Sequence, residues 1–294
     1  MAQGRSPGSF QGVGLGLRRA HLDEVAARED HGVPFWETCP ENLIGDGGRH
    51  HRLASAILDR DPVLTHGLAI SLGGFDPWDG DYLRELDRFL VRAGTPWHSE
   101  HLCFTGVDGS CLHELLPLPF THEATRHTIA RARDLQARLP VPLLLENITY
   151  YAHLGEPEMD EAAFIAEVLE GADVGWLLDV NNVYVNALNF GFDPKAWLTR
   201  MPLDRVAQIH IAGHKKFGSI TVDTHGADVI DPVIELLQWT LARLGRPVPV
   251  LLERDNHIPD FEDLLAERAR IQAAYDAALA PAKTEAAPAE GVRV

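Results

Sequence analysis

The chain has 294 residues, of which 45% are hydrophobic and 23% charged, which is ordinary for a globular protein. Its formal net charge is −17, and its contiguous Lys and Arg runs are no longer than the pairs Arg18-Arg19 and Lys215-Lys216, which argues against a nucleic-acid partner. The apolar runs are too short to cross a membrane, and residues 1–10 lack the apolar core of a secretory signal, so we expect a cytoplasmic protein without a membrane partner.

Apolar runs typical of buried strands alternate with helical patterns along the chain. The strand-like runs are Gly12–Leu17, Pro34–Thr38, Val63–Gly67, Trp97–Phe104, Val141–Asn147, Val174–Val180, Val206–Ile211 and Val248–Glu253. The clearest helical patterns are Tyr82–Ala93, Glu123–Leu139, Glu161–Glu170, Pro232–Leu244 and Phe261–Leu279. Thr121 and Asp160 are expected N-caps, and Pro232 suits a first helical turn.

Continuously apolar strands that alternate with helices predict a parallel sheet covered on both faces. Eight such units match a (β/α)₈ TIM barrel, and a doubly wound open sheet is the alternative. In a barrel the C-terminal strand ends share one pocket, whereas in an open sheet they spread along an edge at about 4.8 Å per strand. Because the strand ends carry a common chemistry, we predict one α/β domain, a (β/α)₈ barrel over residues 11–279, with disordered ends at 1–10 and 280–294.

Six of the predicted strands end in a carboxylate or an imidazole. The residues are His66, His101, Glu146, Asp179, His210 and Glu253. Burying such groups without partners is costly, and Arg and Lys are nearly absent from these ends, so the pattern predicts a metal site. Asn182, Asp223 and His225 follow in adjoining segments and complete a set of nine.

Nine candidate ligands exceed the roughly four that one tetrahedral zinc uses, so the count predicts two or three ions bridged by carboxylates. Nitrogen and oxygen ligands without thiolate suit iron, zinc or manganese, and ligand type does not choose among them. The cysteines form no C-x-x-C pair, and Cys39 and Cys103 are expected to be buried. His98 and Glu100 flank His101 and are expected to support it at most, with His98 exposed to solvent.

Several segments together carry a resemblance to a known family. They are Pro40-Glu41-Asn42-Leu43, Ser71-Leu72-Gly73, Ser99-Glu100-His101-Leu102, Leu145-Glu146-Asn147, Leu178-Asp179-Val180-Asn181-Asn182-Val183-Tyr184, Ile209-His210-Ile211-Ala212-Gly213-His214 and Asp223-Thr224-His225. From about Gly12 to about Leu279 the chain resembles the multinuclear non-haem iron oxidative enzymes. These are peptide-modifying oxygenases related to the methanobactin biosynthesis enzyme.

The resemblance implies a xylose-isomerase-like TIM barrel that binds two or three iron ions, with a mixed-valence Fe(II)/Fe(III) pair and O₂ as co-substrate. It implies three ligand sets. The catalytic iron would be held by Glu146, Asp179, His210 and Glu253, a second by His66, His101 and the bridging Glu146, and a third by Asn182, Asp223 and His225. Asn182 stands where some relatives carry His, which weakens the third set.

The resemblance also implies oxidation of a residue, most readily a cysteine, in a ribosomally synthesised precursor peptide. It implies a small leader-binding partner protein, and a homodimer is an alternative assembly. Two other functions stay open at this point. One is a zinc- or manganese-dependent hydrolase or isomerase on the same barrel, similar to endonuclease IV, and the other is a non-catalytic metal-binding protein.

Overall fold

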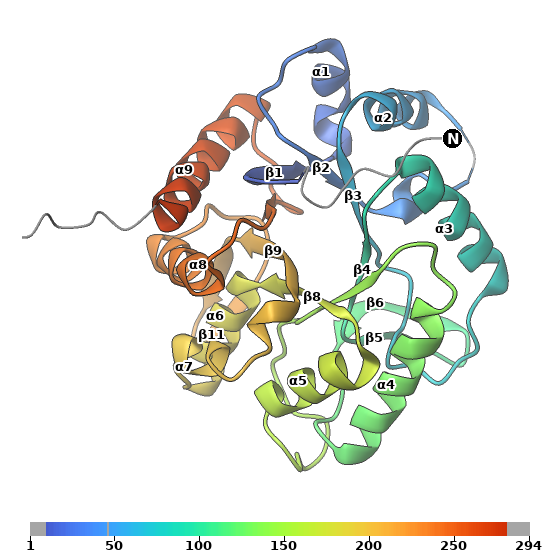
Figure 1. The fold of residues 1–294 in the computed structure, drawn as a ribbon, viewed down its shortest axis with the longest axis vertical. Helices are drawn as coiled ribbons and strands as arrows, with labels where there is room; N and C mark the ends of the chain where they lie inside the picture. The colour runs from blue at the N-terminus through green and yellow to red at the C-terminus, as the bar shows by residue number, and fades with distance from the viewer. Residues whose placement is uncertain (1–9, 46, 281–294) are drawn as a thin grey trace, which may run out of the picture.

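The computed structural model describes residues 10–45 and 47–280, and within them eight parallel strands close into a barrel (Figure 1). The strands are β1 (Val13–Gly16), β2 (Trp36–Thr38), β3 (Val63–His66), β4 (His98–His101), β7 (Leu143–Glu146), β8 (Gly175–Asp179), β9 (Val206–Ala212) and β12 (Val250–Glu253). Strand β1 pairs in parallel with both β2 and β12, which closes the sheet. The predicted (β/α)₈ barrel is therefore confirmed over the open sheet.

Helices surround the barrel as an outer ring (Figure 1). They are α1 (Leu22–Ala27), α2 (Arg49–Arg60), α3 (Gly80–Ala93), α4 (His122–Gln136), α5 (Glu161–Ala172), α6 (Val180–Phe190), α7 (Pro194–Leu198), α8 (Asp231–Leu244) and α9 (Phe261–Leu279). The expected N-caps are present: the Thr121 side chain accepts from the Ala124 backbone N–H, and Asp160 accepts from Ala163. None of the helices in the described ranges is long and apolar enough to cross a membrane.

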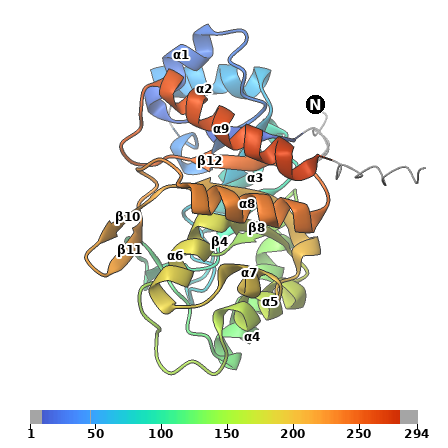
Figure 2. The ribbon, with the colours of Figure 1, turned by 90° about the vertical axis from the view of Figure 1, so that its left-hand side faces the viewer.

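Two hairpins interrupt the alternation of strand and helix, and neither was predicted. Strands β5 (Phe104–Val107) and β6 (Ser110–Leu116) form one, so the predicted strand Trp97–Phe104 was too long and ends at His101. Strands β10 (His214–Phe217) and β11 (Ile220–Asp223) form the other, which projects from the body of the molecule (Figure 2). Asp223 is the last residue of β11.

The lower part of the barrel interior, at the N-terminal ends of the strands, is an apolar layer. It consists of Phe10, Phe35, Leu64, Trp97, Leu144, Leu177 and Leu251. Phe10 is only 1% exposed and lies against the rings of Phe35 and Trp97. The prediction that residues 1–10 are disordered is therefore wrong for residue 10, because the Phe10 ring fills the end of the barrel. Residues 1–9 and 281–294 lie outside the described residues.

Gly14 of β1 shows how tightly this layer is filled. A Cβ atom at this position would lie 2.4 Å from Cε2 of the Phe35 ring, well inside van der Waals contact. The aromatic ring therefore occupies the volume that a side chain on β1 would need. Because interiors are close-packed, neither group can move aside without disturbing its neighbours.

Replacing Gly14 with Ala should lower the free energy of unfolding by about 1–3 kcal/mol, the usual cost of overpacking a core. Gly47→Ala is a matched control, because a Cβ at Gly47 meets no atom within 4 Å. Urea unfolding followed by circular dichroism measures both. Equal unfolding midpoints for the two variants would contradict the packing described for Phe35.

Candidate metal centre

The six predicted strand-end residues lie in one inward-facing layer above the apolar one. Side chains alternate along a strand, so the residue two positions after an inward apolar side chain also faces inward. His66, for example, follows Leu64, Glu146 follows Leu144 and Asp179 follows Leu177. Strand pairing then sets His101 beside Glu146 and Asp179 beside His210. All six are at most 8% exposed.

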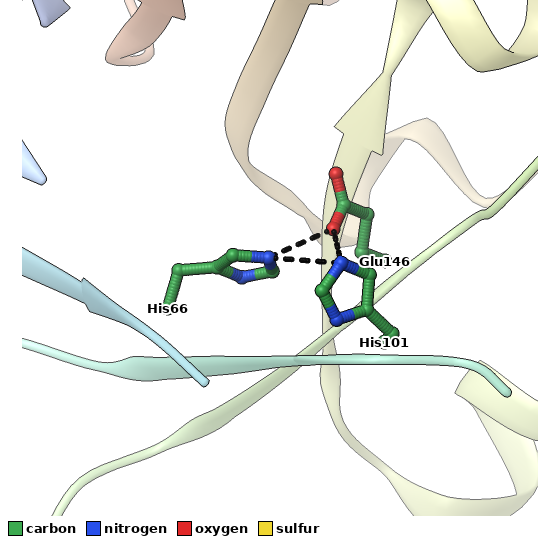
Figure 3. A group of neighbouring side chains, drawn as sticks. All are labelled: His66, His101 and Glu146. Atoms are coloured by element: carbon green, nitrogen blue, oxygen red, sulfur yellow. Dashed lines mark hydrogen bonds and ion pairs between the residues drawn. The ribbon is translucent and has the colours of Figure 1, made fainter. Parts of the chain in front are cut away.

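His66, His101 and Glu146 form the first cluster (Figure 3). The Nε2 atoms of the two imidazoles are 3.1 Å apart, and each lies 3.2 Å from Glu146 Oε2. With ligands about 2.1 Å from an ion, neighbouring ligand atoms in a tetrahedral or octahedral shell lie about 3.0–3.4 Å apart. The three atoms therefore have the spacing of one face of a coordination shell.

Glu146, Asp179, His210 and Glu253 form the second cluster. His210 Nδ1 lies 3.1 Å from Glu146 Oε1 and 3.1 Å from Glu253 Oε2. Glu146 thus presents one oxygen to each cluster. Asp179 accepts the Asn182 backbone N–H at Oδ1, as the N-cap of α6, which fixes the direction of its second oxygen.

His225 belongs to a third group, which differs from the predicted set. Its Nδ1 atom lies 2.9 Å from Asp255 and 3.5 Å from Glu253, whereas its Nε2 atom lies 2.9 Å from Asp223. Asp255 was not predicted, because it stands two residues beyond the end of β12. Asn182 is buried beside Asp179, and its side-chain N–H donates to the Asn147 carbonyl at 2.9 Å.

Glu37 of β2 is a further carboxylate in the inward layer that sequence reasoning missed. Its Oε2 atom lies 3.1 Å from His210 Nε2 and accepts a hydrogen bond from Gln208 Nε2 at 2.5 Å. A carboxylate on one nitrogen of a metal-binding imidazole fixes its tautomer and raises its basicity. Glu37 therefore directs His210 Nδ1 towards Glu146 and Glu253.

His98 and Glu100 lie on the opposite face of β4. Both are fully buried, and His98 Nε2 is 3.1 Å from Glu100 Oε1. The expectation that His98 is solvated was wrong, because the outward face of a barrel strand is covered by the surrounding helices. Cys39 and Cys103 are buried, as expected.

The inward layer shifts the pKa of its own members. Burial lowers the pKa of His101 to about 4, helped by the positive charge of His66. Burial would also lower the pKa of His210, but Glu37, Glu253 and Glu146 outweigh it and raise that pKa well above its ordinary value. Burial and the negative charge of Glu146 raise the pKa of Asp179 well above the usual range.

Several ligand-type atoms of the centre are buried without a hydrogen-bond partner. Asp179 Oδ2 and Asn182 Oδ1 have neither a hydrogen bond nor an ion pair, whereas Glu146 Oε2, His210 Nδ1 and His225 Nε2 lie near other ionisable groups of the centre without hydrogen-bond geometry. Buried polar atoms are normally paired, so such a group indicates a missing partner. Oxygen and imidazole nitrogen atoms that converge in this way fit divalent cations of the iron, zinc and manganese type.

A family model described as "RiPP precursor modification enzyme MbnB/TglH/ChrH" matches residues 12–276, where RiPP denotes a ribosomally synthesised and post-translationally modified peptide. The chain belongs to this family. It is 47% identical over 262 residues to a UPF0276 protein of Pseudomonas aeruginosa, covering 89% of this chain and 91% of the relative. A UPF0276 protein of Shewanella amazonensis is 42% identical over 261 residues, covering 88% and 93%.

Solved structures with low sequence identity share the fold of this family member. A xylose isomerase domain protein of Alicyclobacillus acidocaldarius superimposes with a TM-score of 0.60 at 18% identity, covering 91% of this chain and 99% of that one. An L-ribulose 3-epimerase gives a TM-score of 0.58 at 14% identity, covering 96% and 100%. The expected xylose-isomerase-like barrel is therefore confirmed.

Glu146→Gln should remove at least one equivalent of bound metal per chain, because this carboxylate contributes to two clusters. Glu161→Gln is the matched control, since Glu161 is a buried glutamate outside the barrel interior. Burial raises the pKa of Glu161 to about 8, so glutamine resembles its neutral form. Elemental analysis after loading with Fe(II) or Zn(II) compares the two; equal metal content would refute the bridging position of Glu146.

Metal affinity should fall as pH decreases from 8 to 6. Burial would lower the pKa of His210 and His225, but nearby carboxylates outweigh it and raise both pKa values, so that these imidazoles bind protons more strongly than free histidine and a metal must displace them. Each displaced proton changes affinity by about tenfold per pH unit below the raised pKa. Calorimetric titration with Zn(II) in two buffers of different ionisation enthalpy measures proton release; a buffer-independent enthalpy would contradict this.

Proposed function

We propose that this chain is a multinuclear iron-dependent oxygenase that uses O₂ to oxidise a residue, most readily a cysteine, of a ribosomally synthesised precursor peptide. Membership of a RiPP precursor modification family supports the peptide substrate. The observation that carries the proposal is the pair of carboxylates shared between clusters. Glu146 joins the first two clusters, and Glu253 joins the second and third.

In this proposal the first ion is held by His66, His101 and Glu146, and the second by Glu146, Asp179, His210 and Glu253. The third would lie beside His225: Glu253 and the newly found Asp255 face its Nδ1 atom, the predicted ligand Asp223 faces its Nε2 atom, and Asn182 is a further candidate. When bound, a pair of iron ions would supply the Lewis acidity and the electrons that oxidation of a thiol-bearing residue by O₂ requires.

The surrounding residues prepare this chemistry in three ways. The carboxylates offset the positive charge of several cations in a small volume. Glu37 accepts from the Nε2–H of His210, and Gln208 donates to the same Glu37 oxygen, so that His210 Nδ1 keeps a fixed direction. The apolar layer of Phe35, Leu64 and Leu177 underneath keeps water from reaching the centre through the barrel.

Iron content and peptide modification test the proposal directly. Anaerobic loading with Fe(II) should give at least two irons per chain, and partial oxidation should give the EPR signal of a coupled mixed-valence pair. Co-expression with a short cysteine-containing reading frame adjacent to the gene should produce an O₂-dependent mass change in that peptide. Glu146→Gln should abolish the change, whereas Glu161→Gln should retain it.

Metal specificity separates this proposal from a zinc or manganese enzyme on the same barrel. Fewer than two irons per chain after anaerobic loading, together with hydrolysis or isomerisation by the zinc- or manganese-loaded protein, would favour the alternative.

A small partner protein that binds the leader part of the precursor, a homodimer and a cytoplasmic location stay predictions. Co-purification of the tagged chain from its own cells checks the first two.

A further inference from the structure

A cavity of about 120 Å³ adjoins the metal centre at the C-terminal ends of β1 and β2, beside the start of α2. Three basic side chains line it: Arg18, Arg19 and His50. Its other lining residues are apolar or neutral, and within the described ranges no Asp or Glu lines it. In a chain with 43 acidic and 26 basic residues, a cavity lined by bases without acids marks a place for a negatively charged group.

Arg18 connects this cavity to the metal centre. Its Nη2 atom lies 3.7 Å from Glu253 Oε1 and also contacts Asp255, while its Nε atom is buried without a hydrogen-bond partner. The side chain occupies space that Gly16 leaves open at the end of β1. A Cβ atom on Gly16 would come within 2.9 Å of Arg18 Nε, so a larger residue there would displace the guanidinium group.

The charge balance of the cavity depends on the metal centre. Arg19 is exposed and has no ion pair within the part of the chain that the structure describes. Arg18 is balanced by Glu253 and Asp255. Cations bound by Glu253 and Asp255 would neutralise the negative charge that now balances Arg18. The Arg18 guanidinium could then attract a further anion. Metal loading would therefore make the cavity more attractive to an anion.

We propose that this cavity binds a carboxylate group of the peptide substrate and so positions the neighbouring residue over the metal centre. The proposal rests on the proposed function and specifies its substrate. A guanidinium group can hold a carboxylate through two parallel hydrogen bonds, which fixes its orientation as well as its position. The carboxylate is either the C-terminus of the peptide or the side chain of an Asp or Glu next to the cysteine.

Binding of short blocked peptides tests the proposal. The probes are N-acetyl-alanyl-cysteine with a free carboxylate, the same dipeptide as its amide, and N-acetyl-glutamyl-cysteine amide. Dissociation constants are measured anaerobically by calorimetry on the Fe(II)-loaded protein. At least one carboxylate probe should bind tenfold or more tightly than the alanyl-cysteine amide, and which one does so identifies the source of the carboxylate. Equal affinity for all three probes would overturn the proposal.

Variants assign the preference to the cavity. The double variant Arg19→Gln, His50→Gln should lose most of the preference for carboxylate, and Arg18→Lys should weaken it by removing the two-point contact. Arg52→Gln is the matched control, because Arg52 is an exposed arginine on α2 that does not line the cavity. Metal content is measured for every variant. An unchanged preference in the double variant at full metal content would refute the assignment.

The outcomes separate this proposal from the proposed function. A carboxylate preference in a protein that oxidises no peptide would support the cavity and count against the oxygenase. Oxidation of cysteine peptides with equal affinity for acid and amide would support the oxygenase and overturn the cavity as a carboxylate site.

Discussion

The alternation of side chains along parallel strands in a closed barrel is the constraint on which the whole structure depends. It divides the interior into two layers, because residues two apart on each strand face the same way. Phe35, Leu64 and Leu177 make the lower layer apolar, and Glu37, His66 and Asp179 make the upper layer ionisable. A shift of one residue in any strand would turn its ligand-type side chain outward, towards the helices. His98 and Glu100 already point in that direction.

Much of the fold could be predicted from the sequence, because its strands are buried on both sides and read as continuous apolar runs. The hairpins could not be predicted in this way, since β6 and β10 are mostly exposed and carry no apolar run. The Asp108-Gly109 pair was a signal for the first hairpin, since both residues adopt the positive φ that a two-residue turn requires. Phe10 was missed because a single aromatic residue in a polar segment gives no periodic pattern.

The candidate site was predictable to the extent that its residues end strands. All six strand-end residues meet in one layer, whereas Glu37 was overlooked because Thr38 follows it within the same predicted strand. Asp255 lies beyond the strand, and its approach to His225 depends on loop geometry that no local pattern specifies. The division of ligands between neighbouring groups depends on side-chain rotamers, which the sequence does not encode at short range.

The aromatic group of Phe10, Phe35 and Trp97 closes one end of the barrel, and this has a consequence for the order of events at the other end. In the proposed reaction, reactants and products would therefore enter and leave at the other end, where the strands have their carboxyl ends. A long peptide seated over that entrance would trap any small molecule already beneath it and bar any that had not yet entered. In the proposed reaction, this arrangement would set the order in which the reactants arrive and leave.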